Sequence, residues 1–187
     1  MTIQEIIDRL KAGNERFVAD KLDGKSQNSE RRDHLTGGQQ PYAILLSCAD
    51  SRVVPELAFD TGLGEIFTVR VAGNIANTES VASIEYAVAH LGSKVIVVMG
   101  HESCGAVTAA MGGGDNGYNL NILLSQIAPA VAQANSDDVN TVVKKNAHLN
   151  AEELVNRSAI IREAVEKGNV KIVPAYYHLN TGQVEFL

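Results

Sequence analysis

The chain has 187 residues, 45% of them hydrophobic and 20% charged, which is the ordinary composition of a folded protein and excludes a disordered chain. The 16 lysines and arginines against 22 aspartates and glutamates give a net charge of −6, so we expect no binding to nucleic acid or to an anionic membrane. The longest apolar runs, such as 95–99, are too short to span a bilayer, and no signal-peptide core precedes them. We therefore expect a cytoplasmic protein.

The first half of the chain alternates between helical and strand patterns. Ile3, Ile6, Ile7 and Leu10 recur at helical spacing and predict an amphipathic N-terminal helix. The polar segment 20–40 then forms a long connection. Apolar and β-branched runs predict strands at 42–47, 65–71 and 94–99, with a buried helix over 80–91 that Gly92 ends.

Two more helices are predicted in the second half. Leucines at helical spacing predict a helix over 119–134, which Pro129 breaks or kinks. Asn150 with Glu153 three residues later resembles a capping box, so we predict that a further helix begins at Asn150 and runs to Lys167.

The chain closes with two strand patterns. The runs 170–177 and 183–186 predict strands, joined by a turn at Thr181–Gly182. Strands that alternate with helices predict an α/β fold. We expect a central, mainly parallel β-sheet flanked by helices, in a single domain over residues 1–187.

Both cysteines of the chain follow predicted strands. Cys48 comes directly after the strand 42–47, and His101 and Cys104 come after the strand 94–99. Ligands bind at the carboxyl ends of the strands in open α/β sheets, so we expect these side chains to meet at one edge. Two thiolates and an imidazole suit zinc, and three protein ligands with one open position are typical of a catalytic zinc site. The sequence therefore predicts one Zn²⁺ per chain.

Two other interpretations of the cysteines stay open. Both thiols could be buried and inert beside an unrelated histidine. Alternatively, Cys48 and Cys104 could form a redox pair, although they lack the usual Cys-x-x-Cys spacing.

Asp50 and Arg52 follow Cys48 at a spacing of two residues, which lets their side chains point the same way and pair. An isolated surface ion pair of this kind contributes little to stability. The position beside a predicted metal ligand favours a functional pair. Asp50 is then either a fourth zinc ligand or the acceptor of a hydrogen bond from the solvent oxygen on zinc. A bidentate contact from Arg52 favours the second role.

The motifs around these residues resemble those of the β-class carbonic anhydrases. CADSR at 48–52 and HESCG at 101–105 occur in the family's usual order and separation, and the likeness covers about residues 39–110. The resemblance implies a zinc enzyme that converts carbon dioxide and water reversibly into bicarbonate and a proton. It also implies zinc bound by the two cysteines and His101, with Asp50 and Arg52 as a catalytic dyad.

Further positions resemble the open, plant-like subclass of the family. Gln39 stands where these enzymes carry an amide directed at the substrate, and Phe67 and Tyr86 stand where they carry apolar pocket walls. The Gln39 amide and the Gly105 backbone N–H are expected to hold a substrate oxygen. The other subclass has a tryptophan at the position of Leu45, and this chain has none. From the residues alone, Gln39 is a solvated loop residue and both aromatic rings belong to the core.

The resemblance also implies partners and a path for the proton. Phe67 and Tyr86 usually line a pocket assembled across a dimer interface, so we expect a homodimer or homotetramer whose N-terminal helix crosses to the neighbour. His34 is a candidate proton shuttle only because its imidazole titrates near neutral pH. An exposed surface histidine is the plainer interpretation.

Three other functions stay open at this point. A zinc hydrolase acting on carbonyl sulfide or carbon disulfide would use the same scaffold and the same ligands. A noncatalytic, zinc-stabilised binding protein would have no exchangeable ligand position. A thiol redox protein would bind no stoichiometric metal.

Overall fold

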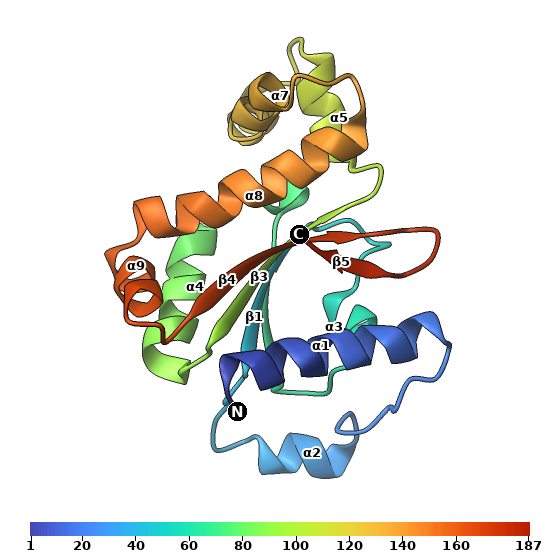
Figure 1. Cartoon of the computed structure of the whole chain (residues 1–187), viewed down its shortest axis with the longest axis vertical. Coiled ribbons are helices and arrows are strands. Elements are labelled where there is room, and N and C mark those ends of the chain that lie inside the picture. Colours follow the sequence, from blue (N-terminus) through green and yellow to red (C-terminus); the bar gives the residue numbers. More distant parts are fainter.

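A five-stranded sheet organises the chain (Figure 1), and the computed structural model describes all residues from 1 to 187. The strand order is β2-β1-β3-β4-β5. The strands are β1 (Ala43–Ser47), β2 (Ile66–Arg70), β3 (Val95–His101), β4 (Lys171–Tyr177) and β5 (Val184–Phe186). The first four are parallel to one another, and β5 pairs antiparallel with β4. The predicted α/β fold with a mainly parallel sheet is confirmed.

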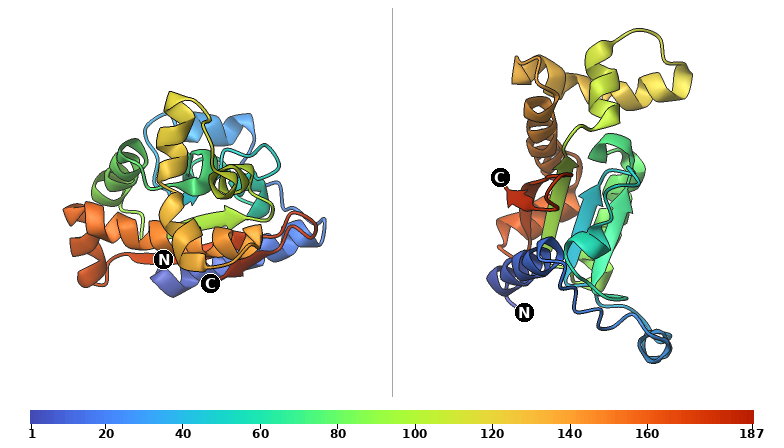
Figure 2. Two further views of the ribbon diagram at one scale, coloured as in Figure 1. Left: turned by 90° about the horizontal axis from the view of Figure 1, so that it is seen from above. Right: turned by 90° about the vertical axis from the view of Figure 1, so that its right-hand side faces the viewer.

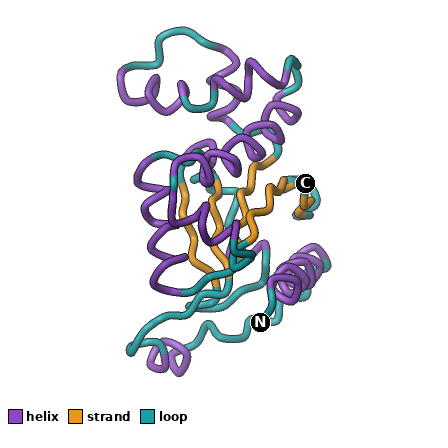
Figure 3. The backbone as a smooth tube through the Cα atoms, turned by 60° about the vertical axis from the view of Figure 1, so that its left-hand side comes forward, coloured by secondary structure: helices purple, strands orange, loops and turns teal.

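Helices cover both faces of the sheet (Figures 2 and 3). One face carries α1 (Ile3–Val18) and α3 (Pro55–Ala58), and the other carries α4 (Thr78–Leu91), α8 (Val139–Arg157) and α9 (Ala159–Glu166). Beyond the carboxyl ends of the strands lie α5 (Gly105–Gly112), α6 (Tyr118–Ser125) and α7 (Ala128–Ala134), and α2 (Ser29–His34) lies at the opposite end. A short 3₁₀ helix, η1 (Ala72–Asn74), follows β2.

The central strands are buried on both faces, which explains why they read as continuous apolar runs. Along β1, Ile44 and Leu46 pack toward α4 and α8, whereas Ala43 and Leu45 pack toward α1. Every residue of β1 and of β3 is buried. This rigid centre fixes the positions of the residues that follow each strand.

The N-terminal helix forms as predicted but packs on its own chain. Thr2 and Glu5 make a reciprocal capping box at its start. The apolar stripe of Ile6, Ile7 and Leu10 is buried in the same core cluster as β1 and β3. This stripe therefore belongs to the core of its own chain, and the crossing of the helix to a neighbour stays a prediction.

The predicted helix over 150–167 is wrong in its boundaries. One long helix, α8, starts well before Asn150 and ends before Ser158. The Ser158 side chain accepts a hydrogen bond from the Ile161 N–H and thereby caps the next helix, α9. The predicted helix over 119–134 is divided into α6 and α7, with Pro129 in the first turn of α7. The segment 20–40 contains α2, which was not predicted. None of the helices is both long and apolar enough to cross a membrane.

Asn14 of α1 joins the two ends of the chain. Its side-chain Nδ2 donates to the Ala58 carbonyl at 2.9 Å and to the Gly182 carbonyl at 2.8 Å. Its Oδ1 accepts from the Val184 N–H at 2.8 Å. Asn14 is buried, so without its side chain these backbone groups would have no water to serve as a hydrogen-bond partner.

Substituting Asn14→Ala should therefore destabilise the fold by about 3 kcal/mol, because it leaves buried backbone groups without partners. Urea unfolding at fixed protein concentration measures this change. Asn119→Ala on the exposed surface of α6 is the matched control and should change the free energy of unfolding little. Equal unfolding midpoints for the two variants would contradict this role of Asn14.

Candidate metal centre and active site

Two neighbouring parallel strands bring Cys48, His101 and Cys104 together. Cys48 follows β1, His101 is the last residue of β3, and Cys104 is the residue before α5. One side-chain atom from each residue lies within 4.8 Å of the others, and the two Sγ atoms are 4.0 Å apart. All three residues are buried. The structure therefore assembles the predicted Cys-His-Cys group.

The histidine presents a free lone pair to this cluster. His101 Nδ1 lies 2.9 Å from the Glu102 carbonyl oxygen, which can only accept, so Nδ1 carries the proton. In the neutral ring Nε2 then carries the lone pair, and it is buried with no hydrogen-bond partner. An orphaned buried nitrogen needs an explanation, and a metal ion provides one.

The two thiols already favour one thiolate. The hydrogen bond from Cys104 lowers the pKa of Cys48 to about 4 against the opposing effect of burial, with further help from the Gly73 N–H. The same contact, together with burial, raises the pKa of Cys104. Sulfur and imidazole donors in one buried cluster fit a zinc ion, which would replace the shared proton.

Asp50 and Arg52 form a bidentate pair beside the cluster. Arg52 Nε donates to Asp50 Oδ1 at 3.0 Å and Arg52 Nη2 donates to Oδ2 at 2.8 Å. The Arg52 backbone N–H also donates to Oδ1, at 2.9 Å. Hydrogen bonds from Arg52 hold the pKa of Asp50 well below its usual range. Asp50 Oδ2 lies 3.9 Å from His101 Nε2, so the carboxylate faces the Cys-His-Cys group.

Arg70 at the end of β2 fixes the loop that carries this pair, a role the sequence did not reveal. Its Nε donates to the Cys48 carbonyl at 3.0 Å. Its Nη2 donates to the carbonyls of Asp50 and Val53 at 2.7 and 2.8 Å. The loop after β1 is thus held from the adjacent strand, and the regular spacing of a strand residue gives no sign of it.

A second unpredicted support comes from η1 and α8. The Gly73 N–H lies 3.4 Å from Cys48 Sγ, and the Gly73 carbonyl accepts from Asn146 Nδ2 at 2.8 Å. Asn150 does not cap a helix: its Oδ1 accepts from the Ala76 N–H at 2.7 Å and its Nδ2 donates to Asn146. Gly73 has φ +73°, and a Cβ there would come within 2.6 Å of Ile127. Only glycine lets the backbone approach the sulfur in this way.

Gln39, Phe67 and Tyr86 lie away from the cluster in the same chain. Gln39 precedes β1 and Phe67 is near the start of β2, whereas Cys48 follows the carboxyl end of β1. The rings of Phe67 and Tyr86 are neighbours, with centroids 6.4 Å apart, and Tyr86 is half exposed. Gln39 and His34 line an open cavity of about 560 Å³ with residues of α4.

Gly105 lies close to the cluster in the chain. It follows Cys104 directly and is the first residue of α5, so its N–H belongs to the unpaired first turn of that helix. The structure therefore brings together the predicted metal ligands, the Asp50–Arg52 pair and Gly105. It does not bring Gln39, Phe67 or Tyr86 to them within one chain.

Comparison with known proteins identifies the family. The family model described as carbonic anhydrase matches residues 43–184. Carbonic anhydrase 2 of Mycobacterium tuberculosis is 39% identical over 181 residues, which cover 93% of this chain and 87% of that protein. A carbonic anhydrase of Mycolicibacterium smegmatis is 39% identical over 183 residues, which cover 94% of this chain and 89% of that protein.

Solved structures agree with these relatives. The β-carbonic anhydrase CafA of Aspergillus fumigatus superposes with a TM-score of 0.74 at 26% identity, covering 97% of this chain and 90% of that one. One of two tetrameric β-carbonic anhydrases of Sordaria macrospora shares the fold with a TM-score of 0.77 at 24% identity, covering 98% of this chain and 97% of that one. With its sequence match over most of its length and its buried Cys-His-Cys group, the chain belongs to the β-class carbonic anhydrase family.

Proposed function

We propose that this chain hydrates carbon dioxide reversibly to bicarbonate and a proton at a zinc ion held by Cys48, His101 and Cys104. The observation that carries the proposal is the buried Cys-His-Cys group with an unpartnered His101 Nε2 beside the Asp50–Arg52 pair. Zinc, when bound, supplies Lewis acidity, which lowers the pKa of the water that attacks carbon dioxide. The residues of the chain then orient this water and the substrate.

Asp50 is in this proposal a hydrogen-bond acceptor and not a zinc ligand. Its carboxylate faces His101 Nε2 and can accept the hydrogen of the attacking water, which aims the lone pair of that oxygen at the carbon. Arg52 holds both carboxylate oxygens, so turning Asp50 toward the metal would break three hydrogen bonds. The Gly105 N–H, in the first turn of α5, is placed to donate to a substrate oxygen as negative charge develops there.

The complete pocket in this proposal needs a second copy of the chain. Gln39 and Phe67 lie near the amino ends of parallel strands, whereas the metal ligands lie at the carboxyl ends, so one chain cannot use both in one site. Tyr86 exposes half of its surface next to Phe67. We assign Gln39, Phe67 and Tyr86 to substrate binding in the site of a neighbour, within a homodimer or a homotetramer.

The proposal extends to the compartment and to the organisation of the chain. Both cysteines are free and belong to the metal group, which suits the reducing cytoplasm. We also assign residues 1–187 to a single domain, which the hydrogen bonds of Asn14 with Gly182 and Val184 support.

Each ligand variant, Cys48→Ser, His101→Ala and Cys104→Ser, should lose most of the bound zinc and the hydration activity with it. Three ligands leave no redundancy in the site. Atomic absorption on the purified variants measures zinc per chain. His148→Ala removes an exposed histidine of α8 and should keep the full zinc content. A ligand variant with full zinc content would remove that residue from the proposed set.

Asp50→Asn should keep zinc but slow carbon dioxide hydration about 100-fold, because it removes one acceptor needed in the transition state. The substitution preserves the shape of the side chain and removes its charge. Stopped-flow hydration assays and zinc analysis on the same preparation separate the two effects. Release of zinc at alkaline pH would instead make Asp50 a ligand and contradict the acceptor role.

Mixed dimers test the shared pocket. Cys48→Ser chains carry an intact Gln39, and Gln39→Ala chains carry an intact zinc site, so one site in each mixed dimer is complete. Two inactive preparations, mixed equally and allowed to exchange subunits, should therefore recover about a quarter of the wild-type activity. Activity that stays at the average of the two separate preparations would show that Gln39 does not act across an interface.

A further inference from the structure

The carbonyl that orients His101 belongs to Glu102, the residue directly after the histidine. The hydrogen bond from His101 Nδ1 to this oxygen keeps the proton on Nδ1 and leaves Nε2 for the metal. Such a partner on the second ring nitrogen fixes both the tautomer and the direction of the ring. The position of the Glu102 peptide therefore decides how well His101 can bind zinc.

Glu102 is fastened to the end of β4 and to the turn that follows it. Its backbone N–H donates to the Tyr177 carbonyl at 2.9 Å. Its carboxylate Oε2 accepts from the Leu179 N–H at 2.9 Å and from the Asn180 N–H at 3.4 Å. A charged acceptor on backbone donors makes a stronger hydrogen bond than a neutral one. Main chain and side chain thus hold the same peptide against the β4–β5 hairpin.

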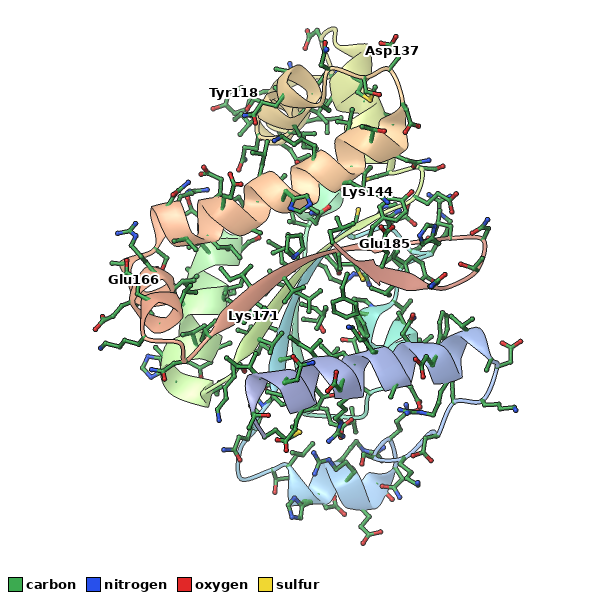
Figure 4. The ribbon with its side chains drawn as sticks, viewed as in Figure 1. Tyr118, Asp137, Lys144, Glu166, Lys171 and Glu185 are labelled. Carbon is green, nitrogen blue, oxygen red and sulfur yellow. The ribbon has the colours of Figure 1, made fainter.

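The hairpin is itself anchored from two directions. Asn14 of α1 bonds to the Gly182 carbonyl and to the Val184 N–H. Lys144 of α8 lies 2.6 Å from Glu185 of β5, and these two side chains are neighbours in Figure 4. The contact made by Glu102 therefore joins the metal group to a part of the chain that is already fixed.

The residue after Glu102 shows that this segment is under constraint. Ser103 has φ +52°, a conformation that costs energy for a residue other than glycine. Its N–H donates to Asn140 Oδ1 of α8 at 2.9 Å. Such a conformation persists only where neighbouring contacts hold it, and the contacts of Glu102 and Asn140 do so on both sides of the strained residue.

We propose that Glu102 is a positioning residue of the metal centre: its carboxylate ties the β4–β5 hairpin to the peptide whose carbonyl orients His101. This inference rests on the proposed role of His101 as a zinc ligand. Zinc binding and the order of the turn at Leu179 and Asn180 are then linked, so that each stabilises the other. A glutamate that only caps the turn would affect stability and leave the zinc affinity unchanged.

The test compares Glu102→Ala and Glu102→Gln with Glu152→Ala, which removes an exposed glutamate of α8 as a control. Zinc loss from the loaded proteins to a competing chelator measures the affinity. Glu102→Ala should bind zinc about 10- to 100-fold more weakly, the usual effect of removing a partner behind a metal ligand. Glu102→Gln keeps an oxygen acceptor for the Leu179 N–H and should lose less. A Glu102→Ala affinity within twofold of wild type would overturn the inference.

Hydrogen exchange in the wild-type protein gives a second readout that needs no folded variant. Removal of zinc should speed exchange of the Leu179 and Asn180 amides, because their acceptor is tied to the metal centre. Unchanged exchange at both amides would equally overturn the inference.

The variant His101→Ala distinguishes failure of the proposed zinc site from failure of the proposed role of Glu102. If it retains zinc, the proposed ligand set fails and the role of Glu102 fails with it. If it loses zinc while Glu102→Ala binds normally, only the role of Glu102 is wrong.

Discussion

The parallel pairing of β1 with β3 is the constraint on which the site depends. It aligns Ala43 with Val95 and Ser47 with Met99, so the residues after both strands emerge at the same edge of the sheet. The loop with Cys48 and the end of β3 with His101 then meet without any distortion of the strands. A shift of the register by one residue would turn Ile44 and Leu46 to the other face and separate the ligands. The stability of the apolar core therefore also sets the geometry of the metal group.

Much of this arrangement could be predicted from the sequence, because the relevant signals are local. The apolar runs of β1 and β3 are continuous because both of their faces are buried. A residue that directly follows such a parallel strand lies at the carboxyl edge of the sheet, where the other strands also end. The pairing of Asp50 with Arg52 was visible in their spacing within a short loop. The apolar spacing of α1 also predicted the face that it buries. In each case the chemistry of a few adjacent residues is sufficient.

The remaining features depend on contacts between distant segments. Asn150 has the appearance of a helix cap, yet it lies inside α8 because η1 offers it a backbone N–H in the core. Arg70 looks like an exposed strand residue until the loop after β1 folds over it. The role of Glu102 has no local signal, because its partners at Leu179 and Asn180 are more than 70 positions away.

The hydrogen bonds of Asn14 also have a consequence for the order of events during synthesis. Its partners at Gly182 and Val184 are 168 and 170 residues away along the chain. The first helix can therefore form early but cannot complete its docking until β5 has left the ribosome. The metal ligands are all made by residue 104, long before the hairpin that steadies them exists. The nascent chain therefore contains both cysteines and the histidine for several seconds before the β4–β5 hairpin is made, because translation adds about 5 to 20 residues per second. In this fold the contacts around the metal group are therefore completed only when the β4–β5 hairpin has been made, well after Cys104.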